Sequence, residues 1–277
     1  MTDDELRQIA NEVRKGILTG VHAAKSGHPG GSLGAADIMT YLYFEEMSVN
    51  PADPRWADRD RFVLSKGHCA PGLYAVLAEK GFFAKEELAT LRHIGSILQG
   101  HPNMNDTPGV DMSTGSLGQG ISAAVGMALA ARQWGQDYRT YALLGDGESE
   151  EGQVWEAAMF AGNQKLDNLC VIVDHNGLQI DGSVDEVNDP MPLADKFRAF
   201  KFHVVEVADG NDVAQLRAAF AEARATKGAP TAIIAETVKG KGVSFMENQV
   251  GWHGKAPNDE QYEQGMAELA ANDAKEA

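Results

Sequence analysis

The sequence predicts an α/β fold in which a parallel sheet is covered by helices on both faces. Short apolar runs of strand length alternate with longer segments of helical periodicity along most of the 277 residues. The runs at 141–144 and 169–173 are apolar at every position, as is typical of strands buried on both sides. We find no internal repeat, low-complexity segment or interdomain linker. We therefore predict one domain over residues 1–277, with a C-terminal tail at 259–277.

The first half of the chain is predicted to be mainly helical. Leu6, Ile9, Val13, Ile17 and Val21 recur at helical spacing within residues 3–25. After that helix we expect, in order, a glycine-rich turn over 26–34, a helix from about residue 35, a loop over 50–61, a short buried strand over 61–65, and helices over 72–80 and 85–93 with a turn at Gly81 between them.

The second half is predicted to carry the remaining strands. It should contain a loop over 100–120, a buried alanine-rich helix over 121–134 and a strand–turn–helix–strand unit over 141–173. We then expect helices over 191–200 and 213–226, strands over 204–207 and 231–237, and a weakly packed helix over 259–277. Parallel strands joined by a helix end at the same edge of the sheet, so the turns that follow them should lie side by side.

Composition limits the possible partners. The formal net charge is −16, and an acidic surface would be repelled by nucleic acid or an anionic membrane. No apolar stretch approaches the length of a membrane span, and the N-terminus is acidic rather than signal-like, so a cytoplasmic location is expected. Cys69 and Cys170 lie in apolar surroundings without metal-ligand spacing, and we expect buried, reduced thiols.

The strand–turn–helix–strand unit carries the most informative polar residues. Gly145-Asp146-Gly147 follows its first strand directly, and Asn176-Gly177 follows its second. A carboxylate from Asp146, an amide oxygen from Asn176 and the Leu178 carbonyl would supply half of the about six oxygens that Mg²⁺ takes; phosphate oxygens and a water would complete the set. Backbone N–H groups at a helix start favour a diphosphate. The plainer interpretation of the first turn alone is a tight strand-to-helix connection with a capping aspartate.

Three glutamates follow the first turn. Glu148, Glu150 and Glu151 lie at the start of the expected helix, where the helix dipole favours any acidic side chain. For Glu148 and Glu150 this interpretation suffices. Glu151, placed one turn into the helix, has no further role that the residues alone indicate.

Four of the eight histidines lie in glycine-flanked loops: His28, His68, His101 and His253. A single loop histidine is usually a solvated side chain, but four such loops at the edge of a parallel sheet indicate a site, because ligands bind outside the carboxyl ends of the strands. Neutral imidazoles can donate hydrogen bonds and move protons at physiological pH. The spacing does not match a zinc site, so proton relay and hydroxyl binding are favoured.

The segment Thr114–Gly120 is a second glycine-rich stretch, and it follows a loop rather than a strand. That context argues against a dinucleotide fingerprint. Two interpretations stay open: a flexible turn before a helix, or a backbone that passes close to a flat ring with Leu117 as an apolar wall.

Together these motifs resemble the N-terminal, diphosphate-binding domain of transketolase, from about Ile9 to Pro257. The matching segments are SGHPGG, DRFVLSKGH, GHP, STGSLGQG, GDGESEEG, DHNGLQIDG and HGKAP. The resemblance implies the thiamine-diphosphate-binding fold, with thiamine diphosphate and Mg²⁺ (or Ca²⁺ or Mn²⁺) as cofactors. It implies metal ligation by Asp146, Asn176 and the Leu178 carbonyl, and cofactor contacts from the residues His68, Gly115, Ser116, Leu117, Gly147, Asn176 and His253.

The resemblance also implies roles toward the substrate. His28, His101 and His253 would touch the sugar phosphate, with His28 and His253 in proton transfer. Glu151 matches the family glutamate that links two active sites across a dimer. Ser116 stands where the long single-chain enzymes usually have proline, a small departure.

One departure is large, because the pyrimidine-binding and C-terminal domains of a full transketolase have no counterpart in this sequence. The missing part carries the glutamate that activates the cofactor and the arginines that hold the sugar phosphate. The chain therefore looks like the first subunit of a split transketolase, paired with a pyrimidine-binding subunit in an α2β2 heterotetramer.

The expected function is transfer of a two-carbon ketol group from a ketose phosphate to an aldose phosphate, as in the pentose phosphate pathway. Two alternatives stay open. One is a subunit of another thiamine enzyme, either deoxyxylulose-phosphate synthase or a 2-oxo acid dehydrogenase. The other is a non-catalytic cofactor-binding paralogue.

Overall fold

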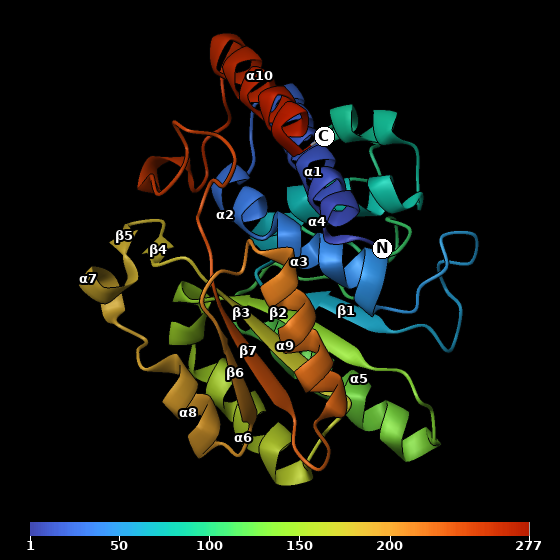
Figure 1. Cartoon of the computed structure of the whole chain (residues 1–277). Helices are drawn as coiled ribbons and strands as arrows, with labels where there is room; N and C mark the ends of the chain where they lie inside the picture. The colour runs from blue at the N-terminus through green and yellow to red at the C-terminus, as the bar shows by residue number, and fades with distance from the viewer. Residues whose placement is uncertain (277) are drawn as a thin grey trace.

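The computed structural model describes residues 1–276 and is built around one parallel sheet (Figure 1). Its five strands lie in the order β1-β2-β3-β7-β6, and every neighbouring pair is parallel. The strands are β1 (Arg61–Leu64), β2 (Thr140–Gly145), β3 (Leu169–His175), β6 (His203–Val207) and β7 (Thr231–Glu236). The predicted fold class is confirmed.

Helices cover both faces of the sheet, as Figure 1 shows. One face packs against α1 (Asp3–Ala24), α3 (Ala36–Tyr41), α4 (Ala70–Lys80) and α9 (Val213–Ala225). The other packs against α5 (Gln119–Trp134), α6 (Gly152–Gln164) and α8 (Leu193–Ala199). Alternate residues of β2 divide between the two cores: Leu143 belongs to the first and Leu144 to the second. Both faces are therefore apolar, which explains the continuous apolar runs in the sequence.

The glycine-rich segment after α1 is a helix where a turn was predicted. It forms α2 (Pro29–Gly34), with Pro29 at its first position. A Cβ atom on Gly30 would lie 2.9 Å from the Trp252 carbonyl oxygen, and one on Gly34 would lie 2.9 Å from that of Val238. Glycine disfavours a helix by itself, but here it allows α2 to pack directly on another backbone segment.

The C-terminal helix is present as predicted, but it is packed more firmly than expected. In α10 (Asp259–Glu276), Leu269 is fully buried and belongs to the core that includes α1. The Asn11 side chain donates a 2.7 Å hydrogen bond to the Leu269 carbonyl. The prediction of weak packing is therefore wrong for the middle of this helix; residue 277 lies outside the described residues.

Two further expectations need correction. Residues 85–90 form a 3-10 helix (Lys85–Thr90) in place of an α-helix reaching 93. α5 is buried on one side only, because its buried residues recur every three or four positions, from Gly120 to Ala131, whereas Trp134 at its end is 75% exposed.

Several short elements complete the chain. A π-helical turn (Leu42–Glu46) extends α3, and 3-10 turns occupy Gly67–Cys69, Gly147–Glu150 and Val250–Trp252. A hairpin of β4 (Leu178–Gln179) and β5 (Gly182–Ser183), followed by α7 (Val184–Asn188), projects beyond the end of β3.

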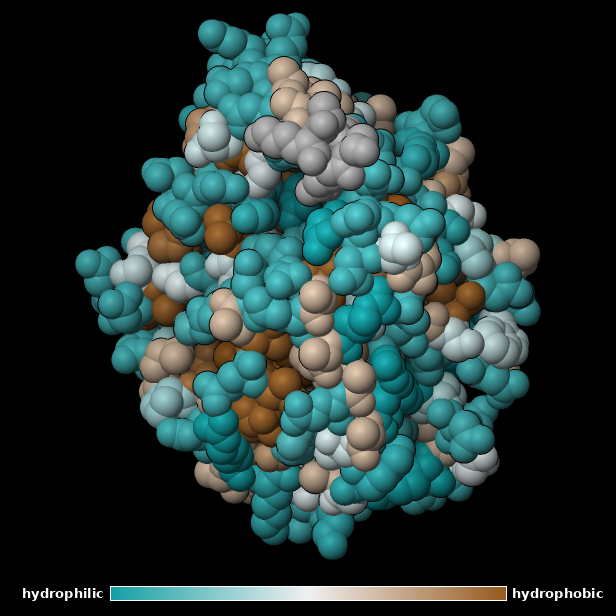
Figure 2. Space-filling model, viewed as in Figure 1, coloured by the Kyte–Doolittle hydropathy of each residue, from teal (hydrophilic) through white to brown (hydrophobic). Residues whose placement is uncertain are grey.

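The surface is mostly hydrophilic, as Figure 2 shows for one face. A brown apolar area lies at the lower left of that view, where Figure 1 places β6. β6 is an edge strand, and its residues 203–205 are only half-buried. Among residues 1–276, no helix combines the length and the apolar character that a bilayer crossing needs.

Candidate functional site

The candidate site lies at the carboxyl ends of the strands, where the turns after β1, β2, β3 and β7 meet. Gly145, the last residue of β2, pairs with Asp174 of β3, so the two predicted turns lie side by side. A cavity of about 270 Å³ opens there. Its lining includes His28, Lys66, His68, Gly115, Leu117, Asp146, Gly147, Asn176, Leu178, Lys239 and His253. Most of the predicted site residues are thus brought together from segments far apart in the sequence.

Asp146 is held between the two turns. Its side chain is 2% exposed. The carboxylate accepts backbone N–H groups from Gly147 at 2.8 Å, Asn176 at 2.9 Å and Gly177 at 2.6 Å. Burial raises the pKa of Asp146, and the nearby Asp174 raises it further, while the backbone hydrogen bonds oppose this. A cation at this carboxylate would relieve the cost of burying its charge.

Asn176 is oriented by the residue two positions before it. The Asn176 amide donates from Nδ2 to Asp174 Oδ2 at 3.0 Å, and its Oδ1 accepts the Leu178 N–H at 3.2 Å on the other side. Asp174 is fully buried, and it also accepts hydrogen bonds from Lys66 Nζ and the Thr237 hydroxyl. Burial alone would raise the pKa of Asp174, but the Lys66 ammonium holds that pKa below its ordinary value. The buried ion pair therefore fixes an amide whose oxygen can serve as a ligand.

The Leu178 carbonyl already has a cationic partner. Lys239 Nζ donates to this oxygen at 2.7 Å, and the Lys239 side chain is 3% exposed. Burial lowers the pKa of Lys239, while Asp146 acts in the opposite direction. A positive charge is thus accommodated beside two of the three predicted metal ligands.

Three half-buried histidines form a cluster in the lining of the cavity, which we call its mouth. The ring centroids of His28 and His68 lie 5.3 Å apart, those of His28 and His253 5.6 Å, and those of His68 and His253 5.1 Å. Burial lowers the pKa of His28 to about 4 and that of His253 to about 3, and nearby cationic side chains add to both shifts. Burial also places the pKa of His68 well below its ordinary value. All three imidazoles are therefore neutral at physiological pH.

Two of these rings lack an internal partner. Nδ1 of His28 and Nδ1 of His253 are buried and form no hydrogen bond within the part of the chain that the structure describes. No contact of this chain therefore fixes the tautomer of either ring. Buried polar atoms without partners are uncommon and indicate a group that binds from outside.

The remaining predicted residues lie around the cavity rather than in its lining. His101 and Ser116 are exposed. The Tyr74 hydroxyl donates a 3.0 Å hydrogen bond to the His101 carbonyl. Glu151 is exposed as well, and it is the N-cap residue of α6 with an extended backbone. The expectation that Glu151 lies one turn into a helix is therefore wrong, because a 3-10 turn separates it from the Asp146 turn.

Sequence reasoning missed the two lysines and assigned Glu148 wrongly. Lys66 and Lys239 each follow the end of a sheet strand by a few residues, and this position was the available signal. Glu148 is 3% exposed and accepts three hydrogen bonds, two of them from distant segments, so it is not a solvated acid at a helix start.

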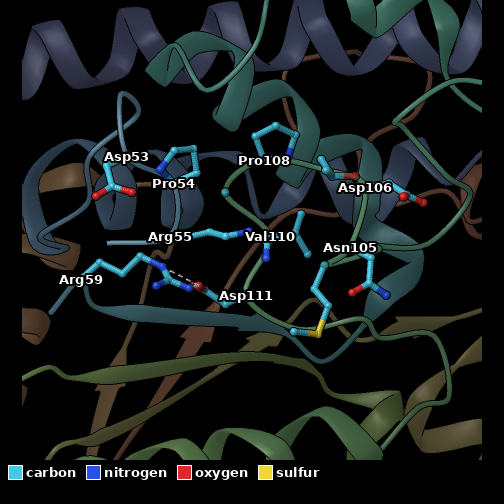
Figure 3. A pocket seen from close by; sticks show the side chains of 12 residues that line it. Asp53, Pro54, Arg55, Arg59, Asn105, Asp106, Pro108, Val110 and Asp111 are labelled. Carbon is cyan, nitrogen blue, oxygen red and sulfur yellow. Dashed lines mark hydrogen bonds and ion pairs between the residues drawn. The ribbon is translucent and has the colours of Figure 1, made fainter. Parts of the chain in front are cut away.

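A larger cavity, of about 540 Å³, lies elsewhere, between the loops at 53–59 and 104–111 (Figure 3). In Figure 3 Arg59 points toward Asp111, and the two side chains form an ion pair at 2.6 Å. Asp111 also accepts the Phe62 N–H at 2.9 Å, so this pair holds the loop against β1. The lining of this larger cavity includes no histidine and no lysine. We therefore favour the smaller cavity as the functional site, because titratable groups converge there at the strand ends.

The residues present fit a divalent cation with a diphosphate. A buried carboxylate, an amide oxygen and a carbonyl oxygen are the hard donors that Mg²⁺ and Ca²⁺ prefer. Lys66 and Lys239 line the same cavity and would attract phosphate oxygens. Within the described residues there is no group of three or more His, Cys, Asp or Glu side chains that could hold a metal ion.

The fold and this site define a class: α/β proteins that bind a diphosphate cofactor at the carboxyl edge of a parallel sheet. The profile of the family described as "Transketolase, thiamine diphosphate binding domain" matches residues 6–276. The chain belongs to the transketolase family, and thiamine diphosphate binding is the property of the domain that it matches. It is an enzyme chain of the transketolase type, and the N-terminal subunit form fits it.

Comparisons with relatives, in sequence and in structure, support the assignment to the transketolase family. The chain is 46% identical to the 6-deoxy-6-sulfo-D-fructose transketolase subunit SqwG of Clostridium sp., with 96% of each chain covered. It is 46% identical to a subunit of the apulose-4-phosphate transketolase of Phocaeicola vulgatus, covering 98% of this chain and 95% of that one. It is 45% identical to human transketolase, of which it spans 42%. A transketolase variant from Pichia stipitis superimposes with a TM-score of 0.90 at 33% identity, covering 100% of this chain and 44% of that one.

Proposed function

We propose that this chain forms the diphosphate-binding half of a transketolase active site. In this role it takes part in moving a two-carbon ketol group from a ketose phosphate to an aldose phosphate. The observation that carries the proposal is the cluster of neutral histidines His28, His68 and His253 in the same cavity as the Asp146 and Asn176 turns. A non-catalytic cofactor-binding protein would need the turns but not three neutral imidazoles at the cavity mouth.

Asp146, the Asn176 amide oxygen and the Leu178 carbonyl would hold Mg²⁺, or Ca²⁺ or Mn²⁺ in its place. Gly147, Lys239 and His253 would hold the diphosphate beside that cation. Gly115, Ser116 and Leu117 would lie along the rest of the cofactor, and Leu117 already lines the cavity. When bound, thiamine diphosphate supplies the chemistry for breaking and forming a carbon–carbon bond next to a carbonyl.

The histidines would act on the sugar rather than on the metal. Since the pKa values of His28 and His253 lie near 4 and 3, both rings are neutral bases at pH 7. Each can accept a proton from a sugar hydroxyl at one nitrogen while the other nitrogen carries the ring proton. His101, exposed in the adjacent loop, would hold a further hydroxyl of the bound sugar phosphate.

A second polypeptide is part of the proposal. Two relatives that the chain matches over nearly their whole length are named as subunits. We propose a pyrimidine-binding partner subunit in an α2β2 assembly, with Glu151 linking the paired sites. The exposed positions of Glu151, Ser116 and His101 support this, because these side chains are accessible to another chain.

The test is to assay ketol transfer by the purified chain alone, by its pyrimidine-binding partner alone and by the two together. We expect activity only in the mixture, dependent on thiamine diphosphate and a divalent metal, and lost in Asp146→Ala. Activity of the chain alone would contradict the split arrangement. A mixture active only with pyruvate would favour a deoxyxylulose-phosphate synthase or 2-oxo acid dehydrogenase type instead.

A further inference from the structure

Glu148 is a buried carboxylate for which the proposed chemistry has no use. It lies two residues after Asp146, in the 3-10 turn that precedes α6, and its side chain is 3% exposed. A buried carboxylate is costly unless hydrogen bonds satisfy its oxygens, so its partners indicate what it does.

Three neutral donors converge on it, two from distant segments and one from the end of β2 just before it. Oε1 accepts the Ser65 hydroxyl at 2.5 Å and the Gly118 N–H at 2.9 Å. Oε2 accepts the Gly145 N–H at 3.1 Å. Burial raises the pKa of Glu148, whereas these hydrogen bonds and the nearby Lys66 lower it. The donors point to an ionised carboxylate, because each of the three offers a proton to an oxygen.

Each donor segment leads directly to residues that line the cavity. Ser65 precedes Lys66 and His68, and Gly145 precedes Asp146. Gly118 follows Gly115 and Leu117, which contribute backbone and an apolar wall to the same cavity. One side chain therefore joins three walls of the site.

The loop at 114–120 depends on this contact because it has few other side-chain anchors. Thr114 holds its start through a 2.7 Å hydrogen bond from Oγ1 to the Leu64 carbonyl. Its end packs closely on the β1 segment, since a Cβ atom on Gly120 would lie 2.6 Å from Ser65 Cα. Gly118 has φ +79° and no side chain, and its N–H to Glu148 ties the turn to the Asp146 segment, in addition to the turn's own hydrogen bond from the Gln119 N–H to the Ser116 carbonyl at 3.3 Å.

A helix-dipole role does not account for these contacts. α6 begins at Gly152, and the Glu148 carboxylate accepts from none of its N–H groups. Two of the three partners, Ser65 and Gly118, are 83 and 30 residues away in sequence, as expected of a tertiary contact rather than a cap, and the third, Gly145, is three residues away.

We propose that Glu148 is a positioning residue that holds the Gly115–Leu117 loop against the Asp146 turn before any cofactor binds. The loop backbone is then already in place when the cofactor arrives, and its ordering does not weaken binding. The effect on cofactor binding rests on the proposed function, whereas the positioning of the loop concerns the chain alone.

Glu148→Gln tests the positioning role directly. Glutamine keeps the size of the side chain but offers one oxygen and one NH₂ group, so one of the three donors must face another donor. In the full chain without cofactor, we expect the amide hydrogen of Gly118 or Gly145 to exchange about tenfold faster or more. Exchange in β3 should remain unchanged. Glu263→Gln, an exposed glutamate on α10, removes the same charge as a control.

Unchanged exchange at both glycines would overturn the proposal, whatever the enzyme's activity. If Glu148→Gln unfolds the chain, Glu148→Asp keeps the charge but is one CH₂ group shorter, so it cannot reach all three donors and should still accelerate exchange at Gly118 or Gly145; no acceleration at either would also overturn it. In the reconstituted enzyme, the apparent KM for thiamine diphosphate should rise about tenfold in Glu148→Gln, by more than kcat falls. A fall in kcat alone would contradict preorganisation of the loop.

Discussion

The floor and the mouth of the cavity differ in whether their buried polar atoms have hydrogen-bond partners among the described residues of the chain. We call floor the buried carboxylates Asp146 and Glu148, which line the cavity, together with Asp174, which pairs with the lining residue Lys66. Each of these carboxylates accepts several hydrogen bonds from the chain itself. At the mouth, His28 and His253 each have a buried ring nitrogen without a partner among the described residues. The floor is complete before a ligand arrives, whereas the mouth is arranged for groups that bind from outside.

This difference indicates how the two regions contribute. A buried charge that loses its partner is strongly destabilising, so breaking an ion pair on the floor should lower the stability of the fold. Neutral half-buried imidazoles contribute little to folding and are available to exchange protons. Substitutions on the floor should therefore change stability or cofactor binding, and substitutions at the mouth should change the rate.

The largest effect should follow removal of a histidine at the mouth. We expect His28→Ala or His253→Ala to lower kcat/KM of the reconstituted enzyme by about 10²- to 10⁴-fold, because a positioned proton carrier is lost. The free energy of unfolding should change by less than about 1 kcal/mol. His203→Ala removes a surface histidine that pairs with Glu222 and serves as the control. If His28→Ala and His253→Ala both had wild-type rates, the mouth would have no separate role in the reaction.

A comparable loss, but of stability, should follow from breaking the floor. Lys66→Met leaves the fully buried Asp174 without its ammonium partner, which should lower the free energy of unfolding by about 3–5 kcal/mol. Urea unfolding of the chain without cofactor measures this.

The double variant Lys66→Met/Asp174→Asn removes both charges, and it should recover more than half of the loss. Lys165→Met, at an exposed lysine, is the matched control. A stability loss in the double variant as large as in the single one would show that packing, rather than the unpaired charge, is responsible.

Lys239 tests whether one residue can belong to both regions. Its side chain is as buried as the carboxylates of the floor, but it also lines the cavity in which ligands would bind. Burial lowers its pKa, so the folded chain gains nothing from its charge, and Lys239→Met should lower the free energy of unfolding by less than about 1 kcal/mol. Binding of thiamine diphosphate with Mg²⁺ to the reconstituted complex should weaken roughly 10- to 100-fold, because a charge-assisted contact is lost.

Calorimetry measures this affinity, and Lys227→Met, at an exposed lysine, is the control. Unchanged affinity would assign Lys239 to the folded framework instead.

The same comparison explains what the sequence could predict. The turns at Asp146 and Asn176 follow apolar strands of one strand–helix–strand unit, so their proximity follows from local rules. The pair of Lys66 and Asp174 spans 108 residues, and no local pattern indicates it.

The predictions that were wrong also concern contacts between distant parts of the sequence. The glycines of α2 look like turn residues until the backbone at Val238 and Trp252 is known to lie against them. Glu148 looks like a helix-start acid because its partners come from distant loops. Local periodicity predicts the elements, whereas contacts across the fold decide which polar residues are buried.

The smallest effect concerns acid stability and again separates the two regions. His28 and His253 have folded-state pKa values near 4 and 3, below the ordinary value of 6.5. The unfolded chain therefore takes up protons at these side chains as the pH falls below about 6.5, while the folded chain does not do so until about pH 4. Their neutral burial is harmless to stability above pH 6.5 and costs stability progressively between pH 6.5 and 4.

Because both rings are only half-buried, each should contribute less than about 1.4 kcal/mol per pH unit to this slope. Urea unfolding of wild type and of His28→Asn/His253→Asn at several pH values across this window isolates the contribution from that of the carboxylates, which both proteins share. We expect a shallower loss of stability in the variant. Parallel curves would mean that the two rings are protonated at the same pH in the folded and unfolded chain, and the mouth could then not be described as a cluster of neutral imidazoles.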